Sequence, residues 1–175
     1  MFIRPPSESL VLGKTTPGEI SSRLGTPYRE ATNIQEGKVI KSLVYSYAVT
    51  IPYVPTIPAK MMAFHFADGI LVGYDFLSSF EEDKTDFDES RVEYIKKGET
   101  GEARIVELFG APGGRYIYPM VKEPGQTALV YQYVRMDRIV STPGAVTQSA
   151  RKNLRVTLGP DGKVADIALS TTVKP

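Results

Sequence analysis

Apolar and polar residues alternate along six stretches of the chain, and this alternation predicts six β-strands. The expected strands cover residues 39–50, 61–67, 70–77, 127–136, 153–158 and 164–171. Asp68-Gly69 separates the second from the third and is typical of a two-residue hairpin turn. Gly159-Pro160-Asp161-Gly162 stands at the corresponding place near the C-terminus. The pattern therefore predicts antiparallel strands in both halves of the chain.

A second sequence motif occurs twice, once before the strands of each half. Residues 13–27 and 98–112 share glycine, threonine, an apolar pair, glycine and proline at an offset of 85. The recurring backbone residues are Gly13, Thr15, Gly25 and Pro27 in the first copy and Gly98, Thr100, Gly110 and Pro112 in the second. In each copy the threonine is expected to cap a helix, the second glycine to end it and the proline to prevent its resumption. Two copies of one supersecondary unit follow from this repetition.

The helices of each unit can be placed from their end signals. Thr16 is the expected N-cap of a helix that ends before Gly25, with Pro17 at its first position and Glu19 completing a capping box. A short helix over residues 7–12 precedes it, and helices over residues 88–97 and 100–109 are expected in the second half. Each unit is thus predicted to contain two helices followed by three strands. We predict an α+β fold, a tandem repeat over residues 1–85 and 86–175 that forms an antiparallel sheet with helices on one face.

Segments without alternation are expected to be connections. Residues 28–37 are polar, and residues 81–86 form an acidic, solvated connector between the two units. Pro52, Pro55 and Pro58 exclude a central strand and favour an extended loop. Residues 137–150 are expected to replace this proline-rich loop in the second unit.

Composition excludes several classes of function. The net charge of +1 supplies no field for nucleic acid, and no apolar run reaches the length of a membrane-spanning helix. There is no cysteine and a single histidine, so neither thiolate nor multi-histidine metal sites can form. We expect no metal and no cofactor.

Catalytic patterns are also absent. Gly13-Lys14-Thr15 resembles the end of a phosphate-binding loop, but Glu8 stands where that motif needs its first glycine. His65 and Asp75 could form a base and its orienting carboxylate, but a simple hairpin at Asp68-Gly69 places His65 opposite Val72. We therefore expect a protein that is not an enzyme.

Tyrosines occupy matching places in the two halves. The candidate partner-binding residues are Tyr45, Tyr47, Tyr53, Tyr131 and Tyr133. They either fill the core beneath the helices or line an open sheet face, where tyrosine suits protein binding. The sequence leaves both possibilities open.

The Gly-x-Thr…Ile…Leu-Gly-x-Pro pattern, with the paired aromatics and the Asp-Gly hairpin, resembles the SmpA/OmlA (BamE-like) family of bacterial envelope lipoproteins. Two such units in tandem resemble the β-lactamase inhibitor protein (BLIP-like) fold. The resemblance implies a periplasmic or outer-membrane protein that reaches the membrane only through a lipid anchor. The lipid-bearing cysteine of that family is missing from this chain, and a true start at Met1 would imply the cytoplasm.

The function expected from these observations is a non-enzymatic protein-binding module that engages another protein through its open sheet face and proline-rich loop. Two alternatives remain open. One is a protease or β-lactamase inhibitor, and the other is a small-ligand carrier with a pocket between sheet and helices lined by Met61, His65 and Tyr74.

Overall fold

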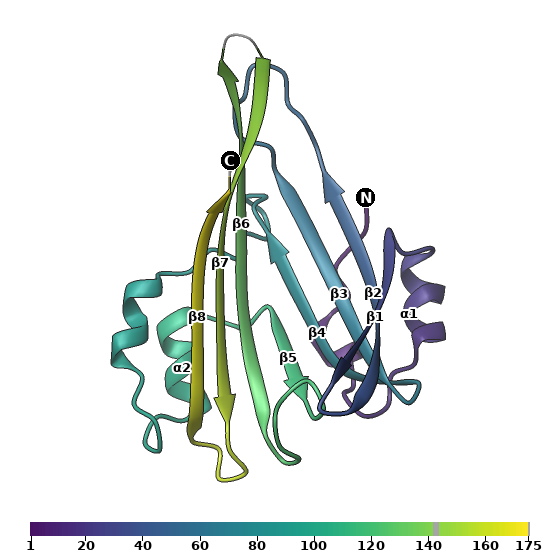
Figure 1. The fold of residues 1–175 in the computed structure, drawn as a ribbon, viewed down its shortest axis with the longest axis vertical. Helices are drawn as coiled ribbons and strands as arrows, with labels where there is room; N and C mark the ends of the chain where they lie inside the picture. Colours follow the sequence, from purple (N-terminus) through teal and green to yellow (C-terminus); the bar gives the residue numbers. More distant parts are fainter. Residues whose placement is uncertain (142–143, 175) are drawn as a thin grey trace.

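The computed structural model describes residues 1–141 and 144–174, and its main feature is a single curved antiparallel sheet (Figure 1). Its eight strands are hydrogen-bonded in the order in which they occur along the chain. They are β1 (Arg29–Gln35), β2 (Lys38–Ala48), β3 (Ala59–Ala67), β4 (Ile70–Ser78), β5 (Gly114–Ile117), β6 (Thr127–Ser141), β7 (Gly144–Leu158) and β8 (Val164–Lys174). The helical elements are short: η1 (Ser7–Ser9), α1 (Pro17–Leu24), η2 (Glu89–Tyr94) and α2 (Glu102–Phe109).

This architecture contradicts the predicted repeat of helix-helix-three-strand units. Each half holds one α-helix, one 3-10 helix and four strands, and the sheet dominates the molecule. The expected helix over residues 88–97 is only the 3-10 helix η2, and β1 lies in the segment predicted to be a loop. One sheet runs through both halves of the chain, and the division at residue 85 stays a prediction.

Helix α1 forms where its end signals predict it. The Thr16 hydroxyl accepts from the Glu19 N–H, and the Glu19 carboxylate accepts from the Thr16 N–H at 2.7 Å, which completes the capping box. Ile20 is fully buried and packs with Leu43, Tyr45 and Phe64 of the sheet. Helix α1 is therefore held by its apolar face, as a helix of about two turns must be.

Helix α2 packs in the same way but begins differently. Ile105 is fully buried against Leu129, Tyr131 and Leu154. The N-cap of α2 is Gly101, and no side chain forms a capping hydrogen bond there. The predicted threonine cap is therefore wrong for this helix. Thr100 instead accepts a hydrogen bond from the backbone N–H of Lys96, as Thr15 does from Val11. Both threonines close the turn that precedes a helix.

The register divides the sheet into two faces. Cross-strand partners lie on the same face, and Phe64, Tyr74, Arg115, Leu129 and Val156 form one continuous row of partners. This is the face that carries the two helix cores. On the other face, the loop between β5 and β6 buries a third cluster that includes Ile40, Tyr116, Met120 and Val130.

The two halves of the sheet meet at a narrow joint. Strand β5 pairs with β4 through two residues only, Tyr116 with Gly73 and Arg115 with Tyr74. Above β5 the strands β4 and β6 diverge (Figure 1). Part of the acidic connector reinforces this joint, because the Thr85 hydroxyl donates to the Gln132 carbonyl at 2.6 Å.

The β2–β3 loop closes the gap further along β6. Ile57 N–H donates to the Met136 carbonyl at 2.8 Å, and Arg138 N–H donates to the Pro55 carbonyl at 2.7 Å. The Thr56 hydroxyl donates to Asp137 at 2.9 Å. The β6–β7 hairpin that receives this loop is longer than predicted, since residues 137–141 and 144–150 extend the two strands instead of forming a loop.

Candidate functional site

The face opposite the helices is the candidate site, and we call it the open face. One row of cross-strand partners spans it: Ala31, Ser42, His65, Gly73, Tyr116, Ala128, Thr157 and Asp166. The charged residues Arg151 and Arg155 of β7 share this face, because they pair with Val134 and Val130. The open face therefore combines polar and cationic side chains with the apolar cluster beneath the β5–β6 loop.

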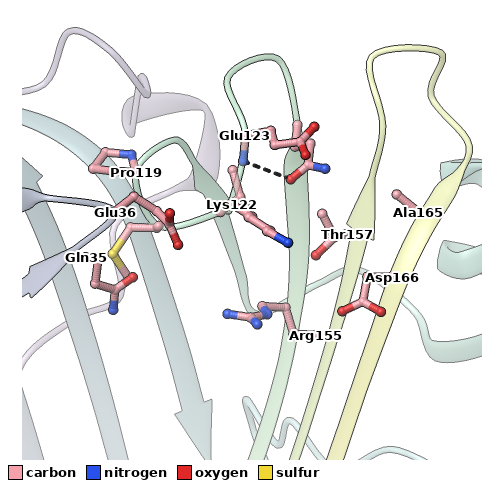
Figure 2. Close-up of a pocket in the computed structure, with 12 residues that line it drawn as sticks. Gln35, Glu36, Pro119, Lys122, Glu123, Arg155, Thr157, Ala165 and Asp166 are labelled. Carbon is pink, nitrogen blue, oxygen red and sulfur yellow. Dashed lines mark hydrogen bonds between the residues drawn. The ribbon is translucent and has the colours of Figure 1, made fainter.

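A cavity of about 590 Å³ lies at one end of the open face, and we call it the lower cavity (Figure 2). The β1–β2 turn, the β5–β6 loop and strands β7 and β8 enclose it. Its lining residues are 35–36, 119–123, 126, 155, 157 and 165–166. Figure 2 shows Arg155 and Lys122 extending into the space between these elements. This size lies within the range of small-molecule sites.

A buried polar network crosses the middle of the open face. The Ser42 hydroxyl lies 2.8 Å from His65 Nδ1, and His65 Nε2 lies 2.9 Å from Asp75 Oδ2. The Tyr116 hydroxyl donates to the same Asp75 oxygen at 2.6 Å. Burial, reinforced by the neighbouring carboxylate, raises the pKa of Tyr116, so this phenol remains a donor.

The prediction that His65 lies opposite Val72, out of reach of Asp75, was wrong, because the two side chains are hydrogen-bonded. A register shift between His65 and Phe66 places Gly73 opposite His65, which brings Asp75 within reach. Gly73 is required there, because a β-carbon would stand 2.6 Å from the Tyr116 ring.

Ser42, His65 and Asp75 are the residue types of a hydrolase triad, but their surroundings differ from those of a catalytic triad. Both ring nitrogens of His65 are occupied, and the Ser42 residue is only 9% exposed. Backbone groups beside Ser42 belong to the β1–β2–β3 ladder, whereas an oxyanion site needs N–H groups that face the reacting carbonyl. The geometry supports a polar network that joins strands β2 to β5.

The predicted tyrosines do not lie together on the open face. Tyr45 and Tyr131 are 3% and 4% exposed and belong to the helix cores, which is the core alternative that the sequence left open. Tyr47 is half-buried and stacks on Phe80, and Tyr133 is half-buried beside Lys152. Tyr53 alone is fully exposed.

Tyr53 stands at the tip of the proline-rich loop. Its backbone has a φ of 63°, a conformation that non-glycine residues rarely adopt. Ile51 and Val54 beside it are each 42% exposed. The loop base is closed by a hydrogen bond from Val49 N–H to the Pro58 carbonyl and by the contacts with β6 described above.

The recurring motif residues occupy equivalent places in the backbone. Gly13 and Gly98 have φ angles of 79° and 77°, and their N–H groups donate to Leu71 and Val164. Gly25 and Gly110 are the C-caps of α1 and α2, and Pro27 and Pro112 follow them. These residues shape the backbone and lie outside the open face.

The pocket that a small-ligand carrier was expected to use does not form. Met61 and His65 line a cavity of about 290 Å³ on the open face, whereas Tyr74 lies in the core on the opposite side of the sheet. Within residues 1–141 and 144–174, no group of three or more histidine or carboxylate residues is placed to hold a metal ion. No helix in the described part of the chain is long and apolar enough to cross a bilayer.

Comparison with known proteins gives one distant structural neighbour. No protein-family model and no curated protein matches the chain, so the resemblance to the SmpA/OmlA family has no support. A solved structure, described as a "putative beta-lactamase inhibitor protein" from Streptococcus mutans, superposes with a TM-score of 0.45. The sequences are 13% identical, and the match covers 90% of this chain and 83% of the other. A likeness this distant carries no argument about function.

Proposed function

We propose that this chain is a protein-binding module whose principal contact is the apolar tip of the proline-rich loop. The observation that carries the proposal is the full exposure of Tyr53 between two partly exposed apolar residues, Ile51 and Val54. Tyrosine combines a large rigid ring with a polar end, and it is enriched among the residues that dominate binding energy at interfaces.

The anchoring of the loop supports the same function. Three contacts tie residues 55–57 to β6, and prolines at positions 52, 55 and 58 limit its conformations. A loop that is already ordered loses little conformational entropy on binding, so its contacts contribute more fully to affinity.

The test is site-specific photocross-linking followed by affinity measurement. A photoreactive phenylalanine analogue replaces Tyr53 in cells, and the cross-linked protein is identified, purified and titrated against the unmodified chain. Tyr53→Asn keeps a residue that tolerates the positive φ but removes the ring. We expect a loss of about 2 kcal/mol, roughly 30-fold in affinity.

Tyr28→Asn is the matched control, because Tyr28 is 77% exposed and lies outside the loop. Its affinity for the same partner should stay within about twofold of the unmodified chain. Equal affinities for the Tyr53 and Tyr28 variants would refute the role of the loop. The expected envelope location depended on the family resemblance and stays a prediction.

A further inference from the structure

The two halves of the sheet have the same register across their four strands. One row of cross-strand partners in each half shows this: Glu30, Leu43, Phe64 and Tyr74 in the first half, and Arg115, Leu129, Val156 and Ile167 in the second. The irregularity in the β3–β4 pairing recurs at the same place in the β7–β8 pairing. Strand β8 is therefore the counterpart of β4, and β1 is the counterpart of β5.

The first residues of β4 and β8 are also held in the same way. Gly13 N–H donates to the Leu71 carbonyl at 2.8 Å, and Gly98 N–H donates to the Val164 carbonyl at 2.8 Å. Beyond this point β4 pairs with β5, whereas β8 is the last strand of the sheet and β1 is the first (Figure 1). Within residues 1–141 and 144–174, the outer edges of β1 and β8 have no pairing strand.

We propose that the free edge of β8 pairs with β1 of a second copy of this chain, in the register of the β4–β5 joint. The joint pairs Gly73 with Tyr116 and Tyr74 with Arg115. The same register places Asp166 opposite Ala31 of the second copy, and Ile167 opposite its Glu30. An exposed sheet edge is a template for a further strand, and here the chain itself shows which strand fits such an edge.

This register brings two exposed apolar side chains together. In the joint, Phe76 N–H donates to the Gly113 carbonyl at 3.1 Å. The counterparts of these residues are Leu169 of β8 and Tyr28, which directly precedes β1. Leu169 is 43% exposed and Tyr28 is 77% exposed. Directly opposite side chains lie on one face of a sheet, so pairing would remove both from water.

The charges near the proposed contact are also compatible. Arg29 of the second copy would lie diagonally across from Asp166 on the open face, a separation that a long side chain can span. Glu30, which would face Ile167, already has its own cation, because Lys41 lies 3.1 Å from its carboxylate. The contact therefore adds an opposite-charge pair and leaves Glu30 with its existing partner.

The contact joins two different edges, so it is head-to-tail. A pair of copies keeps one free β1 and one free β8, and association continues until a ring closes or an open filament forms. The proline-rich loop belongs to neither edge. Self-association is therefore separate from the partner binding proposed for Tyr53.

The experiment mixes two variants that each have one blocked edge. Leu169→Pro removes an N–H from the outer edge of β8, and Glu30→Pro removes one from the outer edge of β1, where an edge strand tolerates proline. In sedimentation equilibrium the mass of the unmodified chain should rise with concentration, and each variant alone should associate at least about tenfold more weakly. An equimolar mixture should form 1:1 dimers, because each variant retains the edge that the other has lost.

Leu169→Lys and Tyr28→Lys form a second pair, which keeps every backbone N–H and should behave in the same way if a proline variant does not fold. Ile34→Lys is the matched control for added charge. Ile34 is 73% exposed on β1 but lies beyond the residues that correspond to β5, so its association should stay within about twofold of the unmodified chain.

Three results would overturn the proposal. Undiminished association of the β1-blocked variant alone would mean that β8 pairs with β8 of the second copy. A mixture of folded variants that stays monomeric would exclude the head-to-tail contact, as would an unmodified chain that is monomeric at about 1 mM. Equal weakening by Ile34→Lys and Tyr28→Lys would reduce the effect to charge alone.

Discussion

Tyr45 and Tyr131 each place a phenol at the end of a helix. The Tyr45 hydroxyl donates to the Gly25 carbonyl at 3.0 Å, and the Tyr131 hydroxyl donates to the Gly110 carbonyl at 2.9 Å. Burial raises the pKa of Tyr131 to about 12 and also raises the pKa of Tyr45. Both phenols therefore stay protonated and keep donating throughout the physiological pH range.

Removing either hydroxyl tests this role. Tyr131→Phe and Tyr45→Phe retain the packed ring and leave the helix-terminal carbonyl to water. We expect each to lower the free energy of unfolding by about 0.5–1.5 kcal/mol, the usual net worth of one hydrogen bond. Urea denaturation measures the change, and Tyr28→Phe, at an exposed position, should show none. Unchanged midpoints in both core variants would contradict the assigned role.

At the level of elements, the ends of the two α-helices depend on glycine. Gly25 has φ 76° and ψ −153°, and Gly110 has φ 80° and ψ −170°. This region is open essentially to glycine alone. A β-carbon at either position would meet nothing within 4 Å, so the requirement comes from the backbone and not from packing.

Gly110→Ala should therefore destabilise the protein by about 1–3 kcal/mol, the cost of holding a side chain in that region. Gly18→Ala is the control, since Gly18 lies inside α1 with open space around it. Alanine there should stabilise by about 0.4–1 kcal/mol, because it reduces the freedom of the unfolded chain. Thermal unfolding of both variants separates the two effects. A Gly110→Ala protein as stable as the parent would exclude the backbone explanation.

Local signals predicted the elements that carry their own end or turn residues. The capping box located α1, and Asp68-Gly69 located the β3–β4 hairpin, where both residues have positive φ angles of 49° and 79°. Strand β1 was missed because it is an edge strand of mostly exposed polar residues, which shows no alternation. Strand β5 was missed because it is short and depends on pairing with distant segments.

The candidate site was less predictable, because it depends on register and on long-range contacts. The His65–Asp75 contact follows from an irregularity in the β3–β4 pairing that Asp68-Gly69 does not reveal. Lys122 lies far in sequence from Arg155 and Thr157 of β7, and only the order of the strands brings the three residues to one cavity. The tyrosine pairs were visible in the sequence, but which face they occupy was decided by tertiary packing.

At the scale of the whole molecule, β4 and β5 are joined by only two residue pairs. Side-chain contacts across this joint are therefore expected to contribute to the stability of the protein. Tyr116 of the second half donates to the nearly buried carboxylate of Asp75 in the first half. A hydrogen bond to a charged acceptor contributes more than a neutral one.

Tyr116→Phe should accordingly lower the free energy of unfolding by about 1.5–3 kcal/mol in urea titrations. The Tyr118→Phe control removes a hydroxyl whose contact with Glu36 is long and exposed, at 3.5 Å, and should change stability by less than about 0.5 kcal/mol. If the two variants lose the same stability, the bond to Asp75 contributes nothing particular to the joint.

The same joint has a consequence for biosynthesis. Strand β4 has no neighbour on one side until residues 114–117 have been made, and the β2–β3 loop cannot reach its partners near Asp137 until still later. A partly synthesised chain would therefore present β4 as an open sheet edge, a template on which nascent chains on neighbouring ribosomes could pair wrongly.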